Sequence, residues 1–375
     1  MIWLALIIPF IVTIYVIIRY KRKVTLWEIA IPLTICVILI AVCKVFTHAI
    51  QTTDIEYWGG CVAQAEYIED WDKEVPCRHP IYETDSKGNS VFVGYEHVYD
   101  VDYYPPQWFV TDSNGIKLRI DKYKFEELAK RFKNRVFVDL HRHYHSKDGD
   151  KFVTKWDGSD NTLEPVTTTH YYENRVQASQ SVFGYCSVDP KVYGLFKYPK
   201  ISGYYNCPAI LGYDGSDLSQ AQRAFNVINS RLGPKRQVRV WVLVFLNQPL
   251  QAGFDQENYW QGGNKNEFVI TIGINKEGKV RWCHVFSWTK VESLKIETRD
   301  YVTSRSKLDL VNLAQWIGPE LEKRFVRKHF KDFGYLSVEP PFWMIIIIYI
   351  FVMLVSIGTS YWIVKNEFEN HPNTL

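Results

Sequence analysis

The chain has 375 residues, of which 47% are apolar and 23% are charged, and its formal net charge is +3 at pH 7. Six of the 44 Lys and Arg residues and three of the 41 Asp and Glu residues lie outside the long segment 48–341, which therefore carries 38 of each and is formally neutral. A neutral segment lacks the basic surface that nucleic-acid binding requires, so no nucleic-acid partner is expected.

Three apolar runs predict transmembrane helices at 2–18, 27–46 and 342–364. The first and third runs contain no charged residue, and the second carries only Glu28 and Lys44, near its ends. A helix needs about 20 mostly apolar residues to cross the hydrocarbon core, and the first run lies at the short end of that range. Since the first run has no basic segment before it and no small-residue cleavage site after it, we expect an uncleaved anchor.

The loop 19–26 between the first two runs is strongly basic. Its cationic side chains are Arg19, Lys21, Arg22 and Lys23. Short loops rich in Lys and Arg remain in the cytoplasm. We therefore expect this loop and the tail 365–375 to be cytoplasmic, in a plasma or bacterial inner membrane. The large domain would then be periplasmic or extracellular.

Residues 48–215 form the first half of that domain and read as β-rich, because short strand-like runs alternate with turn sequences. The expected strands flank two turns: 107–111 and 116–120 around Asp112–Gly115, and 135–145 and 151–156 around Lys147–Asp150. Between these pairs, 124–133 has the spacing of an amphipathic helix. Residues 165–214, rich in Pro, Gly and Tyr, predict a long ordered connection.

From Ser216 to residue 335 the pattern changes to alternating helices and strands, which predicts an α/β sandwich half. Val238–Leu246 is a nearly continuous apolar run, typical of a strand covered on both faces. The other expected elements are helices at 216–232, 252–260, 307–317 and 320–333 and strands at 267–274 and 279–288. The predicted fold class is α+β, with three transmembrane helices, two N-terminal and one C-terminal, holding a two-part soluble domain.

The stretch Tyr259–Gly273 (YWQGGNKNEFVITIG) carries a family resemblance. With the elements around it, the region 216–333 resembles the TPM-domain family of membrane-anchored envelope or thylakoid domains. Asn266-Glu267-Phe268 stands where that family has Asp-Asn-Gly, and the later Gly-rich segment is absent. The resemblance implies an envelope location and, as an alternative function, phosphatase activity, but it assigns no catalytic residue to this chain.

One cluster of side chains could bind a metal ion. Asp139, His141, His143 and His145 alternate along the expected strand 135–145. Alternate residues share one face of a strand, and neighbouring imidazoles are ligands for zinc or copper. The alternative is a solvent-facing polar side of a hairpin, and no cofactor is then required.

The loop Gly262-Gly263-Asn264-Lys265-Asn266 could cradle an anion through its backbone N–H groups and Lys265, or it could be a simple turn. A cation site near this loop would need acidic residues from other segments, and the candidates are Asp214, Asp217 and Asp255.

Four of the seven cysteines bracket short segments, Cys61 with Cys77 and Cys186 with Cys207. In an oxidising compartment they would form two local disulfides. The alternative is four unrelated thiols.

Together these features predict a non-enzymatic envelope protein that binds or assembles with another protein. The third apolar run carries small residues at Ser356, Gly358 and Ser360, which suit helix packing within the bundle or between copies. The alternative is a metal-dependent hydrolase or phosphatase. A channel or transporter is disfavoured, because no ionisable residue lies inside the spans.

The sidedness can be tested with a thiol reagent that does not cross membranes. In intact cells we expect the Lys117→Cys variant to take up more label than the unsubstituted chain does. The Lys21→Cys variant should take up additional label only after the cells are permeabilised. The opposite pattern would place the large domain in the cytoplasm.

Overall fold

The computed structural model describes residues 2–20, 26–179, 184–201 and 207–365. Its chain divides into two compact units. One unit comprises residues 1–55, 171–185 and 329–375, and the other comprises residues 56–170 and 186–328. Both predicted halves of the large domain contribute to the second unit.

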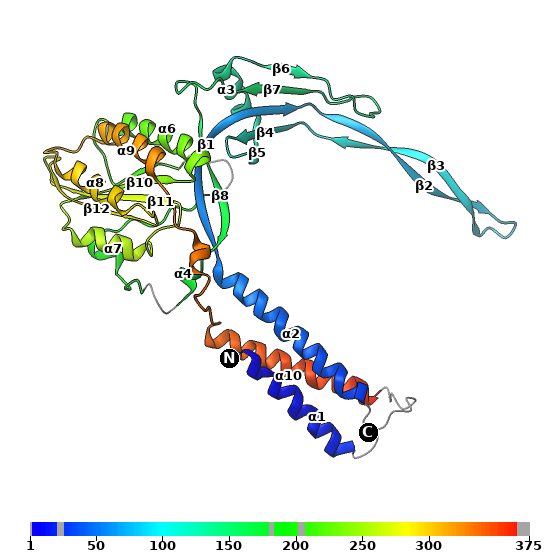
Figure 1. Ribbon diagram of the computed structural model, residues 1–375. Coiled ribbons are helices and arrows are strands. Elements are labelled where there is room, and N and C mark those ends of the chain that lie inside the picture. Colours follow the sequence, from blue (N-terminus) through cyan, green and yellow to red (C-terminus); the bar gives the residue numbers. More distant parts are fainter. Residues whose placement is uncertain (1, 21–25, 180–183, 202–206, 366–375) are drawn as a thin grey trace. The chain divides into compact units, whose positions relative to one another are not determined.

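The first unit contains the three long apolar helices (Figure 1). They are α1 (Ile7–Tyr20), which a 3₁₀ turn at Ile2–Leu6 precedes, α2 (Leu26–Thr52) and α10 (Phe342–Lys365). All three are long and apolar enough to cross a membrane, over Ile2–Arg19, Trp27–Thr52 and Phe342–Ile363. This confirms three candidate spans. The basic residues Lys21, Arg22 and Lys23 and the tail after Lys365 lie outside the described residues.

Six buried side chains of the 3₁₀ turn, α2 and α10 form one small cluster, while many of the other apolar side chains are exposed, as lipid-facing residues are. The cluster consists of Ile2, Ala5, Cys36, Ile40, Ile348 and Val352. The small residues of α10 are also partly buried and partly exposed. Ser356 and Ser360 are buried, whereas Gly358 is exposed and no atom lies within 4 Å of the place a Cβ would occupy. At least two of the three positions therefore pack inside the described bundle.

A polar cluster joins the remaining parts of the first unit. The Asp54 carboxylate accepts hydrogen bonds from Tyr172 Oη at 2.9 Å and from Asn174 Nδ2 at 2.7 Å. Asn174 also caps the short helix α4 (Arg175–Ala178). Arg175 then donates to the Gly334 carbonyl, directly after the 3₁₀ turn η2 (Phe330–Phe333).

In the second unit, one sheet has the strand order β5-β4-β1-β7-β6, and β8 pairs with β1. The strands are β1 (Thr53–Ile68), β4 (Gln107–Asp112), β5 (Lys117–Ile120), β6 (Val136–Val138), β7 (Lys151–Lys155) and β8 (Pro165–Glu173). Helix α3 (Lys122–Phe132) begins at Asp121, whose carboxylate accepts the Lys124 N–H. The helix buries Phe125 and Leu128 against this sheet. The structure thus confirms the helix at 124–133 and the first predicted hairpin, whose Gly115 has φ +82°.

The second sheet has the order β12-β11-β10-β9. Its strands are β9 (Ile210–Leu211), β10 (Arg239–Leu246), β11 (Glu267–Ile274) and β12 (Val280–Ser287). The first three are parallel, and β12 is antiparallel to β11. Helices α6 (Leu218–Arg236), α8 (Glu292–Thr303) and α9 (Leu310–Arg324) cover one face, and α7 (Gln251–Tyr259) lies on the other (Figure 1). A short helix, α5 (Pro190–Tyr193), lies in the connection before β9.

The helices of this half differ from the predictions in three ways. Residues 307–317 and 320–333 were expected to form two helices, but α9 runs through Pro319 as one helix and ends at Arg324. Helix α8 was not predicted, because its buried face consists only of Leu294, Thr298 and Val302. Helix α6 continues one turn past the expected stop at Gly233-Pro234, and Gln237, with φ +52°, ends it.

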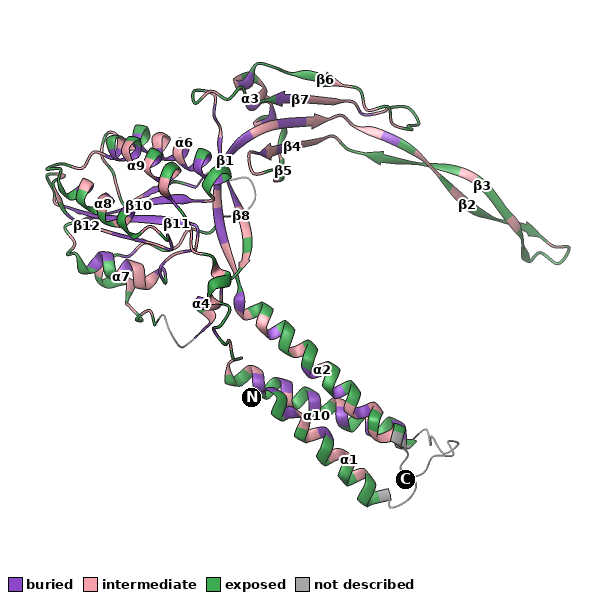
Figure 2. Cartoon of the chain, viewed as in Figure 1, coloured by how far each residue is buried: buried purple, intermediate pink, exposed green. Residues whose placement is uncertain are grey.

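Strands β2 (Trp71–Thr84) and β3 (Ser90–Tyr104) form a separate two-stranded sheet, closed by a turn around Asp85 and Gly88. Figure 1 shows it as a long twisted ribbon, and Figure 2 shows that most of it is exposed, in contrast to β10 and β11. Only Asp72 among its strand residues is buried. No helix or further strand among the described residues pairs with this hairpin, so its stability depends mainly on pairing between its own strands.

Two glycines bring β1 and α6 into direct backbone contact. A Cβ at Gly233 would lie 1.7 Å from the Gly59 carbonyl oxygen, and a Cβ at Gly59 would lie 2.3 Å from the Asn229 carbonyl oxygen. Neither position can accept a side chain unless the backbone moves. This contact holds the β-rich part of the second unit against the α/β part.

We therefore predict that Gly233→Ala lowers the free energy of unfolding by about 2 kcal/mol, because overpacking outweighs the gain in helix propensity. Urea unfolding followed by tryptophan fluorescence measures the effect. Gly94→Ala is the control, since nothing lies within 4 Å of that Cβ position, and its effect should stay within about 0.5 kcal/mol. Equal stability of the two variants would contradict the close contact.

Candidate functional site

The histidine row does not form a continuous strand face. The strand predicted at 135–145 is wrong beyond Val138, where β6 ends, and His141 has φ +43°. A left-handed residue breaks the alternation on which the row depends. His141 instead pairs with Asp139 at 3.0 Å, and His145 Nδ1 lies 2.9 Å from Glu74 Oε1.

Asp72 holds the segment after β6 through hydrogen bonds. The Asp72 carboxylate accepts the N–H groups of Ser146 and Lys147, at 2.7 and 2.9 Å, and the Ser146 hydroxyl. These hydrogen bonds lower the pKa of Asp72 to about 2. Asp139 comes close to Asp148 and Asp150, and this acidic group includes none of the three row histidines.

One N–H of the loop Gly262–Asn266 is already hydrogen-bonded to the carboxyl group of Glu267 on the following strand. The Asn264 N–H donates to Glu267 Oε2 at 2.8 Å, and the Gly262 and Gly263 N–H groups donate to the carbonyls of Glu257 and Trp260. Lys265 lies 3.7 Å from the buried Glu56, and Asn266 donates to the Tyr57 carbonyl. The N–H groups expected to cradle a ligand therefore serve the fold.

Glu267 is fully buried beside an equally buried arginine. Glu267 and Arg239 are register partners at the starts of β11 and β10. Glu267 Oε1 accepts Trp241 Nε1 at 2.9 Å and the Tyr198 hydroxyl. Arg239 donates to Thr167 Oγ1 and to the Cys207 carbonyl, both at 3.0 Å. Burial raises the pKa of Glu267, and these donors, with the arginine, oppose that shift.

The three acidic residues considered for a cation site near this loop do not form a ligand group. Asp217 accepts the Tyr213 hydroxyl at 2.6 Å, and Asp255 accepts Gln251 Nε2 at 2.7 Å. Neither these two nor Asp214 belongs to the groups of ligand-type side chains that converge within the described residues.

Neither expected disulfide is present, because all seven cysteines are free thiols. Cys61 lies on β1 and Cys77 on β2, in nearly continuous extended chain. At about 3.3 Å per residue, sixteen residues separate them by tens of ångströms, whereas a disulfide needs Cα atoms within about 7 Å. Cys207 is buried beside Arg239, and Cys186 is exposed, with its N–H bonded to Asn258 Oδ1.

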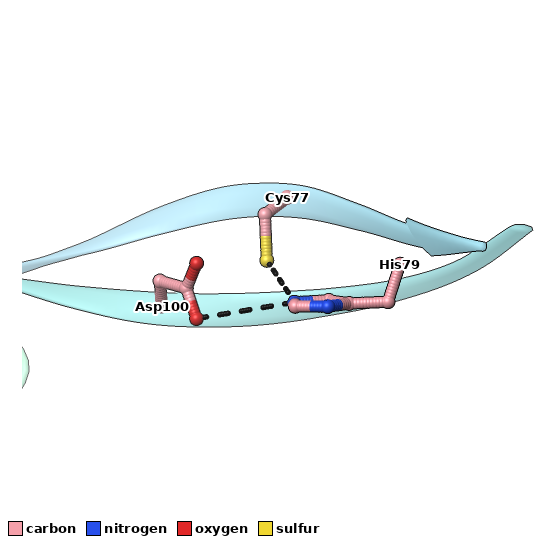
Figure 3. Close-up of side chains that lie close together, drawn as sticks. All are labelled: Cys77, His79 and Asp100. Atoms are coloured by element: carbon pink, nitrogen blue, oxygen red, sulfur yellow. Dashed lines mark hydrogen bonds and ion pairs between the residues drawn. The ribbon is translucent and has the colours of Figure 1, made fainter.

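The structure instead brings Cys77 to His79 and Asp100, on the hairpin β2–β3 (Figure 3). The Cys77 Sγ and His79 Nε2 atoms lie 3.1 Å apart, and His79 Nε2 lies 4.0 Å from Asp100 Oδ1. Burial and the Asp100 carboxylate raise the pKa of the Cys77 thiol. This group was not predicted from the sequence, because Asp100 is 23 positions from Cys77 and only the strand register brings them together. The alternation Cys77-x-His79 was the available signal.

The contribution of Glu267 and its hydrogen-bond partners to stability can be tested with a substitution that leaves no cavity. Glu267→Gln keeps the volume of the side chain but removes a negative charge close to Arg239. It also places an amide N–H₂ group next to groups that themselves donate hydrogen bonds to Glu267. We expect a loss of about 3 kcal/mol in the free energy of unfolding, typical of breaking a buried charge pair. Glu277→Gln, in an exposed turn, is the control and should change stability by less than about 0.5 kcal/mol. An equally small effect at Glu267 would contradict that contribution.

No family model, curated protein or solved structure gives a significant match to this chain. The resemblance of 216–333 to the TPM-domain family therefore stays a prediction, and the function must be argued from the geometry described above.

Proposed function

We propose that this chain is a non-enzymatic integral membrane protein of the cell envelope that binds a protein partner through the hairpin β2–β3. The three candidate spans would fix the chain in the bilayer, and the large unit would stand on the periplasmic or extracellular side. The observation that carries the proposal is the apolar surface of the hairpin.

The hairpin exposes ten large apolar side chains, and no element among the described residues covers them. The large apolar side chains exposed on it are Ile81, Tyr82, Val91, Phe92, Val93, Tyr95, Tyr99, Val101, Tyr103 and Tyr104. Contiguous exposed apolar patches mark interaction sites, and tyrosine is enriched where proteins meet. Odd-numbered residues of β3 share one face, so Tyr95, Tyr99 and Tyr103 form a stripe, here called the tyrosine stripe.

The two edges of the hairpin differ. Strand β2 contains Pro76 and Pro80, which lack the N–H that a pairing strand would accept from. Strand β3 contains no proline over its 15 residues. A partner strand would therefore pair with β3, and the tyrosine stripe would supply the side-chain contacts, as in recognition by strand addition.

The charge of the hairpin favours a neutral or basic protein surface as the partner. Residues 71–104 carry seven acidic and three basic side chains, a formal charge of −4. An anionic lipid surface would repel such an arm, whereas a basic groove would attract it and speed association.

The proposal predicts position-dependent crosslinking. A photoreactive phenylalanine derivative in place of Tyr99 should crosslink the full-length chain to one dominant protein in intact membranes. The same derivative in place of Tyr123, an 81% exposed residue of α3, is the control and should give no such adduct. The mass of the adduct distinguishes a second copy of this chain from a different protein.

The replacement of Tyr95, Tyr99 and Tyr103 by serine should reduce the yield of adduct from a probe at Val101 by about tenfold, equivalent to about 1.4 kcal/mol. Adducts of equal yield at positions 99 and 123, or an adduct at 101 that the three serines leave unchanged, would overturn the proposal.

A further inference from the structure

We propose that Cys77, His79 and Asp100 form a zinc site that links the two strands of the hairpin β2–β3. The inference does not depend on the partner proposed above, because the three side chains lie on the opposite face from the tyrosine stripe. In the register, Cys77 is opposite Val98 and Val75 is opposite Asp100, so Cys77, His79 and Asp100 share one face.

The distances between the ligand atoms suit tetrahedral zinc. With zinc bonds of about 2.3 Å to sulfur and about 2.0–2.1 Å to nitrogen and oxygen, tetrahedral angles place S and N about 3.6 Å apart and N and O about 3.3 Å apart. The observed separations are 3.1 Å for Cys77 Sγ to His79 Nε2 and 4.0 Å for His79 Nε2 to Asp100 Oδ1. All three ligand atoms lie within 4.8 Å of one another. Small side-chain rotations would suffice to close the coordination.

The donor set also suits zinc in its chemistry. A thiolate, an imidazole and a carboxylate are the three side-chain ligand types that zinc uses, and hard cations such as Mg²⁺ and Ca²⁺ avoid thiolates. Binding would release the Cys77 proton to solvent, and the zinc–sulfur bond would take its place. Glu96 lies opposite His79 on the same face and adds negative charge to it, and a water molecule would complete the coordination.

The hairpin gives such an ion a structural role. An isolated two-stranded sheet is marginally stable in water, and units without a core commonly use a metal or a disulfide. All seven cysteines are free thiols, and the hairpin strands bury only Asp72. A zinc ion held by two ligands from β2 and one from β3 would crosslink the ribbon near its middle, where no other element supports it.

The test uses the full-length protein, purified in detergent, stripped with a chelator, reloaded with Zn²⁺ and dialysed. We expect one zinc per chain by elemental mass spectrometry. Cys77→Ser and His79→Ala should each weaken zinc binding by about 100-fold or more. The loss of a residue that only hydrogen-bonds to a metal ligand already weakens binding by about 10–100-fold. Three variants serve as matched controls and should retain zinc: Cys186→Ser (an exposed thiol), His97→Ala (the opposite face of β3) and His143→Ala (the histidine row).

Two further readouts separate metal binding from a folding defect. Co²⁺ in place of zinc should give a thiolate-to-metal charge-transfer band in the near ultraviolet, present in His97→Ala and absent in Cys77→Ser. Zinc should also slow trypsin cleavage after Arg78, which lies between two ligands, in the wild type but not in Cys77→Ser.

Two outcomes would overturn the proposal. One is a reloaded wild-type chain without zinc. The other is a zinc content and cobalt spectrum that Cys77→Ser leaves unchanged. Crosslinking through the tyrosine stripe can succeed or fail independently of either result.

Discussion

The second unit depends on two charged side chains, Arg239 and Glu267, that water does not reach. Arg239 and Glu267 stand side by side at the starts of two parallel strands, and both are fully enclosed. Burial of such charged groups costs free energy unless they are hydrogen-bonded. Neighbouring segments supply partners for the Glu267 carboxyl group and for two guanidinium nitrogens of Arg239, whereas Arg239 Nε has none among the described residues. Tyr198 comes from the connection before β9, and Thr167 comes from β8. The β-rich and α/β parts of the sequence therefore complete one polar core, which explains why both lie in one compact unit.

The predictions that held were those with a strong local signal. The apolar run of β10, the Asn-Gly turn before Gly115 and the three candidate spans could be read from spacing and composition. Helix α8 could not, because its polar sequence presents only a narrow apolar face. The hairpin β2–β3 was also not recognised. Most of its side chains are exposed, so neither of its faces shows the apolar alternation of a strand that packs on a core. Two helices were expected at 307–317 and 320–333, but the buried side chains on both sides of Pro319 keep α9 one continuous helix.

The candidate sites show the same limit. The histidine row was inferred from regular alternation, and one residue in a left-handed conformation, His141, removes that regularity. The glycine loop was expected to be an anion cradle or a simple turn, and its Asn264 N–H donates to the carboxyl group of Glu267 in the same chain. Cysteines close in sequence were expected to pair, although an extended strand carries them apart. The cysteine, histidine and aspartate that do meet lie in two strands, and no sequence spacing predicts their register.

The two prolines of β2 limit how large any assembly through this ribbon can become. If two copies join along β3, the product is a four-stranded ribbon whose outer edges are both β2 strands, each interrupted at Pro76 and Pro80. Such edges are poor templates, so growth stops at a pair. In that case a long apolar ribbon that could otherwise nucleate fibres would form a closed complex of fixed stoichiometry.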